Sequence, residues 1–392
     1  MPEEATVELV SPEFEFTDSM RMVQETARNF AEREIRPTVM RFDESQEFPH
    51  EIIRKLGELG FMGIILPEEY GGAGFGYLEY VTMLEEISRV DPSIGLSLAA
   101  HNSLCCNHLY TFGNEAQRKK FLPELGSGRM IGAWALTEPT SGSDAGGMLT
   151  TAVKGPGGYA INGSKNFITH GSVAGVTVVM AIVDRSKGKK GISAFLVENG
   201  TPGFIVSKKE NKLGMRCCDT SALAFDNCRI PEGNLLGDEG TGFNQALAVL
   251  DGGRISIAAL AVGIAQGALD ASLKYARERK QFGKPIGEFQ AIQWKLADMA
   301  TGIEAARLLT YRAAHFKNQG KDVTLESAMA KYFAGEVAVA ATNEAVQIHG
   351  GYGFIKDFPV EKFYRDVKLV TIGEGTTEIQ KMVIARELLR QL

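Results

Sequence analysis

A group of short β-branched runs in the middle of the chain most constrains its fold, because helical patterns flank it on both sides. Residues 134–240 hold the apolar runs 176–183 (VTVVMAIV), 192–197 (ISAFLV) and 203–206 (GFIV), and turn clusters such as 184–191 (DRSKGKKG) separate them. This spacing is typical of antiparallel strands. We therefore expect a middle β domain, built as a small antiparallel barrel or sandwich.

The segments on either side have the periodicity of helices. The C-terminal part predicts a four-helix bundle, with one long helix that runs to about Arg279, helices at roughly 286–318 and 324–348, and a last helix near the C-terminus. The expected fold class is α+β and multi-domain, with an N-terminal all-α domain, the middle β domain and the C-terminal bundle. The predicted domain boundaries are 1–133, 134–240 and 241–392.

The composition is that of an acidic protein with a sizeable core. Of the 392 residues 44% are hydrophobic, and 42 basic against 48 acidic residues leave a net charge of −6. The hydrophobic content argues against extensive disorder. The negative balance argues against a nucleic-acid partner, which would require a basic face. The six histidines follow neither H-x₃-H nor H-E-x-x-H spacing, so no metal site is predicted.

The cysteines and the N-terminal segment indicate the compartment. Five cysteines form the adjacent pairs 105–106 and 217–218 and the single Cys228, without C-x-x-C spacing. This usage favours reduced thiols in the cytoplasm. The first 14 residues lack a signal-peptide core and an Arg-rich transit pattern. The longest mildly apolar run, 255–269, is interrupted by glycine and glutamine, so we expect no membrane-spanning helix.

Glu374 lies between two glycines in the segment 372–380 (IGEGTTEIQ). A carboxylate whose neighbours have no side chains can approach a ligand closely, and glycine permits backbone conformations closed to other residues. On this local pattern alone, either a catalytic base or an ordinary surface loop would fit. A capping box is predicted just after it, from Thr377 to Gln380.

Five segments together carry a resemblance. They are TEPTSGSD (137–144), KNFITHGS (165–172), ERKQFGKPIGEFQ (278–290), QIHGGYGF (347–354) and IGEGTTEIQ (372–380). With their order and the length of the chain, they resemble the acyl-CoA dehydrogenase family, in particular its short-chain (butyryl-CoA-like) or short branched-chain members. The resemblance covers nearly the whole chain.

The resemblance implies a flavoprotein that converts an acyl-CoA thioester to the trans-2-enoyl-CoA. FAD would accept the β-hydrogen as hydride, since no side chain supplies that redox chemistry. It also implies an electron-transfer flavoprotein as electron acceptor, a homotetramer built as a dimer of dimers, and a place in fatty acid or amino acid catabolism.

The resemblance further implies where FAD binds. Small hydroxyl and glycine residues of the first segment would border the flavin ring, and Phe167, where many relatives have Trp, would cover it. The third and fourth segments would reach the FAD of a neighbouring subunit, with the Arg279 guanidinium on the pyrophosphate. The implied FAD-binding residues are Trp134, Leu136, Thr137, Gly142, Ser143, Phe167, Thr169, Arg279, Phe282, Gln290, Gln347, Gly351, Thr376 and Glu378. His349, which lies among them, has no partner in the sequence and is interpreted as a packed histidine.

Glu374 is the catalytic base that the resemblance implies, and desolvation is expected to raise its pKa toward about 6–7. Some relatives carry their catalytic glutamate one residue before the arginine of an LDGGR-like segment, and here that position is Gly253. Gly373 stands where relatives often have Tyr, and the missing side chain would either widen the acyl pocket, which would favour a branched or cyclic acyl group, or only shift the packing. The implied substrate-binding residues are Ser143, Asp251, Arg254, Gly373, Gly375 and Arg386.

Purely structural roles for some of these residues stay open. Asp251 and Arg254, three apart on one helix, would also fit a surface ion pair, and Arg386 would fit a solvated helix arginine. Two alternative functions also remain. One is an acyl-CoA oxidase that uses O₂, and the other is a flavin-containing homologue that binds nucleic acid without dehydrogenase activity.

Overall fold

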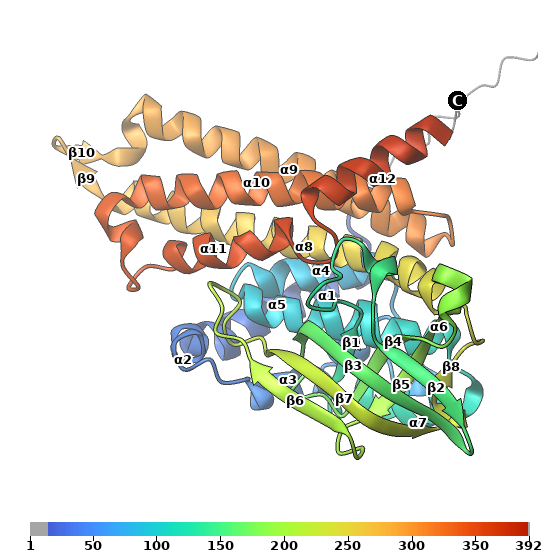
Figure 1. Cartoon of the computed structure of the whole chain (residues 1–392). Helices are drawn as coiled ribbons and strands as arrows, with labels where there is room; N and C mark the ends of the chain where they lie inside the picture. The colour runs from blue at the N-terminus through green and yellow to red at the C-terminus, as the bar shows by residue number, and fades with distance from the viewer. Residues whose placement is uncertain (1–14, 391–392) are drawn as a thin grey trace, which may run out of the picture.

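The computed structural model describes residues 15–390 of the chain and shows three parts in succession (Figure 1). Helices come first, a β sheet follows, and long helices complete the chain. The expected α+β class, with its all-α N-terminal part and its C-terminal helical part, is confirmed.

Seven α-helices form the described N-terminal part. They are α1 (Asp18–Phe30), α2 (Val39–Ser45), α3 (His50–Glu58), α4 (Tyr77–Ser88), α5 (Pro92–Ala99), α6 (Asn107–Phe112) and α7 (Glu115–Gly126). Asp91 caps α5 by accepting a hydrogen bond from the amide of Ser93 at 2.9 Å, and Pro92 fits the first turn. Between α5 and α6 the chain widens into a π-helical segment, Ala100–Cys106. Such segments often mark functional sites.

One sheet of eight strands forms the middle part. The strands are β1 (Gly132–Ala135), β2 (Thr151–Gly155), β3 (Gly158–Thr169), β4 (Val176–Ile182), β5 (Ile192–Glu198), β6 (Phe204–Lys209), β7 (Thr220–Pro231) and β8 (Leu235–Leu236). Their order is β6-β7-β3-β2-β4-β5-β8, and β1 pairs with β4. Every residue of β4 is buried. Its continuous apolar run is typical of a strand covered on both faces.

The sequence predicts a purely antiparallel sheet, and this prediction is wrong for strand β4. β4 pairs in parallel with β1 and, at Thr151 and Ile182, with β2. Neither strand is joined to β4 by a hairpin, because β1 enters from the helical part and β3 intervenes between β2 and β4. Only a tight turn forces neighbouring strands to run antiparallel. The remaining pairs of this sheet are antiparallel.

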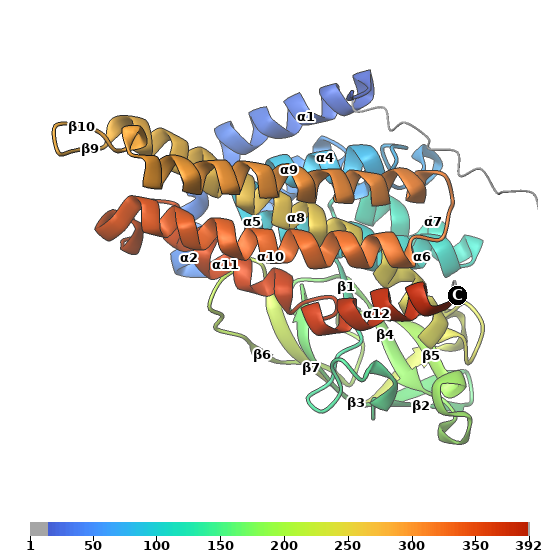
Figure 2. The same ribbon diagram turned by 90° about the horizontal axis from the view of Figure 1, so that it is seen from above.

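The C-terminal part is built on three long helices that lie side by side (Figure 2). Its helices are α8 (Gly242–Glu278), α9 (Gln290–Asn318), α10 (Thr324–His349), α11 (Val360–Asp366) and α12 (Thr377–Arg390). A two-stranded hairpin, β9 (Lys280–Gln281) and β10 (Lys284–Pro285), joins α8 to α9. The helices expected at about 286–318 and 324–348 are therefore present.

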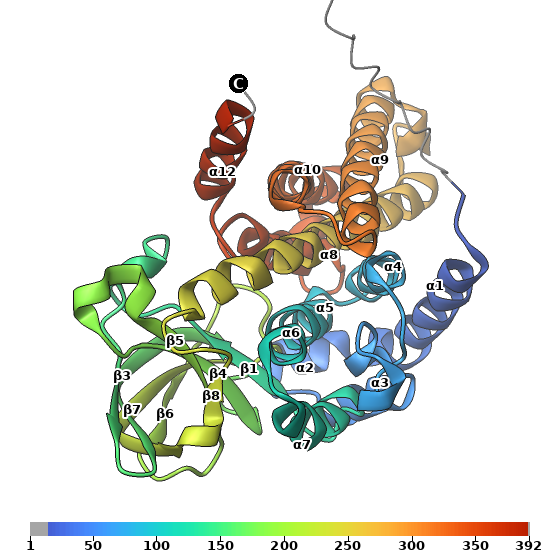
Figure 3. The same ribbon diagram turned by 90° about the vertical axis from the view of Figure 1, so that its right-hand side faces the viewer.

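Helix α8 runs through the middle of the molecule and contacts all three parts (Figure 3). Close approach depends on its glycines, because a Cβ at Gly263 would lie 2.7 Å from Ser88 Cβ of α4. Within the described residues α8 is the one helix that is long and apolar enough, by length and composition only, to cross a membrane. However, 78% of that apolar window is buried inside the protein, as in the core helix of a folded domain.

Candidate active site

The loop that carries Glu374 connects a 3₁₀ segment, Val367–Thr371, to helix α12. Glu374 has φ of +53°, in the left-handed region that residues other than glycine rarely adopt, and Gly375 follows with φ of +94°. The carbonyl of Gly375 accepts hydrogen bonds from Lys331 Nζ and from Gln380 Nε2, the latter at 3.0 Å. The strained backbone is therefore held by side chains of two different helices.

The Glu374 carboxyl group points at helix α8. Its Oε2 atom is buried and has no hydrogen-bond partner among the described residues. A Cβ at Gly253 would overlap this Oε2 atom and would lie 3.1 Å from Leu104 Cδ2. The space beside Gly253, where some relatives carry their glutamate, is thus filled by the carboxyl group of Glu374.

Burial raises the pKa of Glu374 to about 7, while the positive charges of Lys331 and Arg254 pull it down. A carboxyl group with this pKa is partly ionised at neutral pH and can accept a proton efficiently. The structure therefore gives this side chain the protonation behaviour of a general base.

Arg254 and Asp251 lie on the same stretch of α8 and are not a surface pair. The Arg254 side chain is 7% exposed and donates to Asp251 Oδ1 at 2.6 Å. Asp251 also accepts a hydrogen bond from Thr324 Oγ1 at 2.9 Å, and burial raises its pKa. Arg254 Nε has no partner among the described residues. A buried guanidinium with a free donor beside Glu374 is suited to a polar ligand.

The second group of site residues lies where β1 and β3 end. Strand β3 is irregular between Lys165 and Ile168, and within this irregularity Phe167 has φ of +57° and is 63% exposed. Because of this irregularity, Phe167 and Thr169 do not share one face as they would on a regular strand. Instead, the irregularity turns the Phe167 ring outward as a platform, and Thr169 is half-buried.

A buried ion pair fixes this platform. Lys165 Nζ donates to Glu138 Oε1 at 2.8 Å and to the carbonyl of Leu136 at 3.0 Å. The amide of Asn166 donates to the carbonyl of Thr137 at 2.8 Å. The first two sequence segments are thus joined, and Gly142 and Ser143 are exposed in the loop that follows.

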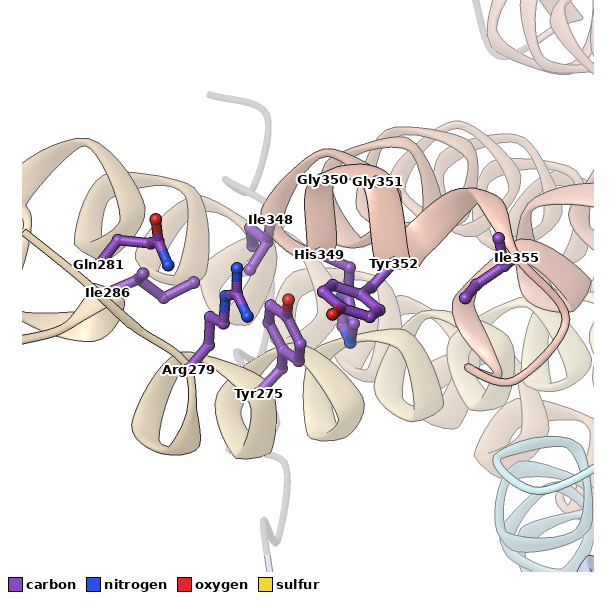
Figure 4. A pocket seen from close by; sticks show the side chains of 10 residues that line it. All are labelled: Tyr275, Arg279, Gln281, Ile286, Ile348, His349, Gly350, Gly351, Tyr352 and Ile355. Carbon is purple, nitrogen blue, oxygen red and sulfur yellow. The ribbon is translucent and has the colours of Figure 1, made fainter.

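A third group surrounds a pocket of about 550 Å³ at the hairpin end of the bundle (Figure 4). The Arg279 guanidinium lies over the ring of Tyr352, 5.2 Å from its centroid. A Cβ at Gly350 or Gly351 would meet no atom within 4 Å, so a ligand can approach the backbone there. His349 also lines this pocket. Its ring stacks on Tyr275 and it bonds the carbonyl of Ala345 at 2.8 Å, which confirms the interpretation as a packed histidine.

This pocket is remote from Glu374. The β9–β10 hairpin lies at the end of the bundle opposite α12 in both Figure 1 and Figure 2. Phe282 at the hairpin tip is 94% exposed, and Gln290 and Gln347 are exposed on the neighbouring helices. The residues at the hairpin are therefore brought together with one another but not with the loop before α12 that carries Glu374.

The second and third groups fit a flavin dinucleotide by their chemistry. The outward Phe167 ring offers an apolar surface to a flat heterocycle. Arg279 and the open glycine backbone offer the cation and the close approach that a diphosphate requires.

Three family models match the chain in succession, and all describe acyl-CoA dehydrogenases. The N-terminal domain matches residues 17–129, the middle domain 133–228 and the C-terminal domain 240–389. An acyl-CoA dehydrogenase of Bacillus subtilis (strain 168) is 50% identical over 373 residues, which are 95% of this chain and 98% of the relative.

This chain belongs to the acyl-CoA dehydrogenase family. Two solved structures agree with this assignment, each covering 97% of this chain and 100% of its own. The butyryl-CoA dehydrogenase of Megasphaera elsdenii has a TM-score of 0.95 and 45% identity. A chain from a study of the electron-transferring flavoprotein of Acidaminococcus fermentans has a TM-score of 0.96 and 48% identity.

Membership makes the protein an oxidoreductase that acts on acyl-CoA by flavin-dependent dehydrogenation. The oxidase alternative is not favoured, because the relatives that define the family assignment are dehydrogenases.

Thr376 and Glu378 of this acyl-CoA dehydrogenase line a smaller pocket of about 200 Å³ at the start of α12. The capping interaction predicted for Thr377 is made instead by Thr376, which accepts from the amide of Ile379 at 3.4 Å. Thr377 is the first helical residue and donates to Glu336 at 3.0 Å. Arg386 is exposed on α12 and pairs with Glu387 at 2.9 Å.

Reasoning from the sequence missed Leu104, His108 and Gln245, which surround the predicted site residue Trp134. Leu104, in the π-helical segment, contacts the same space as Glu374, and Trp134 packs against the small cluster that contains Leu104. The Trp134 indole donates to His108 Nδ1 at 2.9 Å, and His108 Nε2 contacts Gln245 Oε1 at 2.8 Å. Burial lowers the pKa of His108 to about 4, so this histidine is a neutral support at physiological pH.

Tyr77 and Lys331 were also missed. The Tyr77 hydroxyl is buried without a partner among the described residues and occupies the space beside Gly252. Lys331 lies on α10 among buried alanines. A single charged residue on an otherwise apolar helix face is unusual, and this pattern in the sequence could have identified Lys331 as a site residue.

Proposed function

We propose that the protein dehydrogenates a short-chain or short branched-chain acyl-CoA, with Glu374 as the base that removes the α-proton. The observation that carries this proposal is the buried, unpartnered Oε2 atom of Glu374 beside Gly253, on a carboxyl group whose pKa burial raises to about 7. An unpartnered carboxylate is costly to bury, and a substrate C–H that gives up its proton supplies the missing partner.

The residues of this chain divide the work. Glu374 accepts the α-proton and becomes a neutral carboxylic acid, which suits its buried position. Its backbone N–H, presented by the left-handed turn, would donate to the thioester carbonyl as enolate character develops. Arg254 and Asp251 would bind the polar part of the CoA chain.

FAD is the cofactor that we propose. When bound, it would accept the β-hydrogen of the substrate as a hydride. Phe167, Thr169, Trp134 and the loop with Gly142 and Ser143 would hold its ring. The diphosphate would bind at Arg279 and Gly351 of a second subunit, since these residues line the pocket at the hairpin end of the bundle, whereas Phe167 lies on strand β3 of the middle sheet. Thr376 and Glu378 would hold the adenosine end beside the smaller pocket.

The short acyl group is supported by the likeness to the butyryl-CoA dehydrogenase of Megasphaera elsdenii. Gly373 leaves room beside the base, because a Cβ there would make only ordinary contacts, the nearest at 3.5 Å to Leu369. We propose that this room admits a branched or cyclic acyl group.

The remaining proposals concern the surroundings of the enzyme. An electron-transfer flavoprotein is the proposed acceptor, in line with the likeness to a chain studied with that protein in Acidaminococcus fermentans. A homotetramer in fatty acid or amino acid catabolism is proposed from the family. The cytoplasm is proposed because all five cysteines are buried and free.

The test is spectral. Purified protein is expected to carry yellow FAD, and acyl-CoAs of increasing length and branching are added anaerobically while the flavin absorbance is recorded. Bleaching is expected to be fastest with a short or short branched acyl-CoA. If no saturated acyl-CoA bleaches the flavin, the proposed reaction is wrong. If only long chains do, the proposed substrate class is wrong.

A further inference from the structure

Lys331 is a buried ammonium group without a carboxylate in contact. Lys331 is 1% exposed, and among the described residues no carboxylate oxygen lies within 4.0 Å of its Nζ atom. Neighbouring positions on α10 are small and buried, as at Ala328, Ala334 and Gly335. Burying a lysine in such surroundings is unfavourable unless its charge interacts with something nearby.

The Lys331 ammonium contacts the loop of the base. Its Nζ donates to the carbonyl of Gly375, the residue after Glu374. Gln380 Nε2 donates to the same carbonyl at 3.0 Å, so one backbone oxygen receives a charged and a neutral donor. Two consecutive left-handed residues lie just before this oxygen. The two donors therefore stabilise a strained left-handed backbone conformation that would be unfavourable without them.

Lys331 is also close enough to the Glu374 carboxyl group for their charges to interact. The other charged or titratable groups around Glu374 are few. Helix α8 contributes Arg254, whose charge is largely engaged by Asp251 at 2.6 Å. Helix α4 contributes Tyr77 and Tyr80, and burial raises the pKa of each. Helix α12 contributes Glu378 and Arg386, both exposed. Lys331 is thus the cation without a carboxylate contact on this side of the site, within the described residues.

We propose that Lys331 is a positioning residue for proton abstraction, which aims the Glu374 side chain through the Gly375 carbonyl and favours its ionised form. This inference rests on the proposed role of Glu374 as the base.

Two pKa values set the expected pH window. Glu374 must be a carboxylate, and its pKa is about 7. Burial lowers the pKa of Lys331 to about 8, so its ammonium is lost as the pH rises above that value. The productive pair of a Glu374 carboxylate with a Lys331 ammonium is therefore most populated between about pH 7 and 8. Activity is expected to fall on both sides.

Three variants of the FAD-loaded enzyme test the proposal through the pH profile of kcat/KM and of anaerobic flavin bleaching. Lys331→Met is expected to move the acid limb up by about one pH unit, equivalent to a tenfold loss below the limb. Lys331→Arg is expected to keep the acid limb and to remove the fall above about pH 8, because a guanidinium stays charged. Gln380→Met, the matched control, removes the neutral donor and is expected to lower kcat without moving the limb.

A direct readout needs no turnover. The infrared band of the protonated carboxyl group that disappears in Glu374→Gln is titrated in the wild type and in Lys331→Met, and its midpoint is expected about one pH unit higher in the variant. The proposal would be overturned if the midpoint of the carboxyl titration were the same in Lys331→Met as in the wild type. It would also be overturned if the acid limbs of the kcat/KM profiles of Lys331→Met and Gln380→Met coincided.

If Lys331→Met does not fold, the Lys331→Arg profile still decides, because an unchanged basic limb excludes the lysine as its source. The role of the base is checked separately. Full activity in Glu374→Gln would remove the proposed function, whatever the Lys331 variants show.

Discussion

At the scale of single residues, the carboxyl group of Glu374 occupies the space that a side chain at Gly253 would fill. The glycine has no side chain on the face where the carboxyl group lies, and any Cβ there would overlap Oε2. Two positions distant in the sequence therefore present alternatives for a base in the same place. Only one of them can be filled at a time, because the packing leaves no room for both.

Removal of the base should abolish turnover and leave cofactor binding intact. Glu374→Gln is expected to lower kcat by about 10²–10⁴ and to retain the FAD spectrum. In the wild type, kcat/KM should rise with pH through about 7, because the carboxyl group must lose its proton before it can accept one. Steady-state assays from pH 5 to 9 measure both effects. Activity of Glu374→Gln within about tenfold of wild type would place the base elsewhere.

Adding one methyl group at Gly253 should damage catalysis more than folding. Gly253→Ala is expected to displace the Glu374 carboxyl group, and a misplacement of about 1 Å can cost about 10²-fold in rate. Gly233→Ala is the control, since a Cβ there would meet nothing within 4 Å. Single-turnover flavin bleaching compares the two. Equal rates would show that the carboxyl group moves aside without penalty.

At the scale of elements, the ends of β1 and β3 form one unit because Lys165 joins them. The ammonium is buried with Glu138 and the Leu136 carbonyl, and the irregular turn of β3 that exposes Phe167 follows two residues later. The position of the aromatic platform thus depends on a buried ion pair two residues before it in the chain.

Breaking this ion pair should cost far more than breaking an exposed one. Lys165→Met leaves the Glu138 carboxylate buried without its cation, which typically costs about 3–5 kcal/mol in the free energy of unfolding. Lys154→Met removes the exposed pair with Glu232 (3.2 Å) and should change the free energy of unfolding little, because water screens such a pair. Chemical denaturation of both variants gives the comparison. Similar losses would mean that the Lys165 pair is not a structural clamp.

The helices of the C-terminal part show how far element prediction reaches. Expected ranges of 286–318 and 324–348 correspond to α9 at Gln290–Asn318 and α10 at Thr324–His349. Their periodicity is a local property, since residues three and four apart share a face. The parallel pairing of β4 was missed because strand partners far apart in sequence leave no such local pattern.

At the scale of the whole molecule, the residues implied for one FAD are divided between two distant places. Arg279 and Gly351 line the pocket beside the hairpin, whereas Phe167 lies on β3 of the middle sheet and Glu374 lies in the loop just before α12. The exposed Phe282 and Phe354, at 94% and 88%, are consistent with a surface that a second subunit covers.

Complementation between two inactive variants tests a shared site. Glu374→Gln and Arg279→Ala should each be inactive alone. In mixed dimers one site carries both changes and the other carries neither, so co-expression should restore about a quarter of wild-type activity if subunits pair at random. Activity that stays at the level of the separate variants would mean that each chain builds its own site.

The sequence alone was sufficient for the helical periods, the order of the three parts and the residues of the five segments, including Glu374, because these are carried by local spacing and residue type. Only the tertiary structure placed Leu104, Tyr77 and Lys331 around the base. They come from the segment after α5, from α4 and from α10, and only packing brings these segments together. It also decided that the Glu374 carboxyl group is desolvated and that Arg279 lies beyond its reach, since burial and separation are properties of the folded chain.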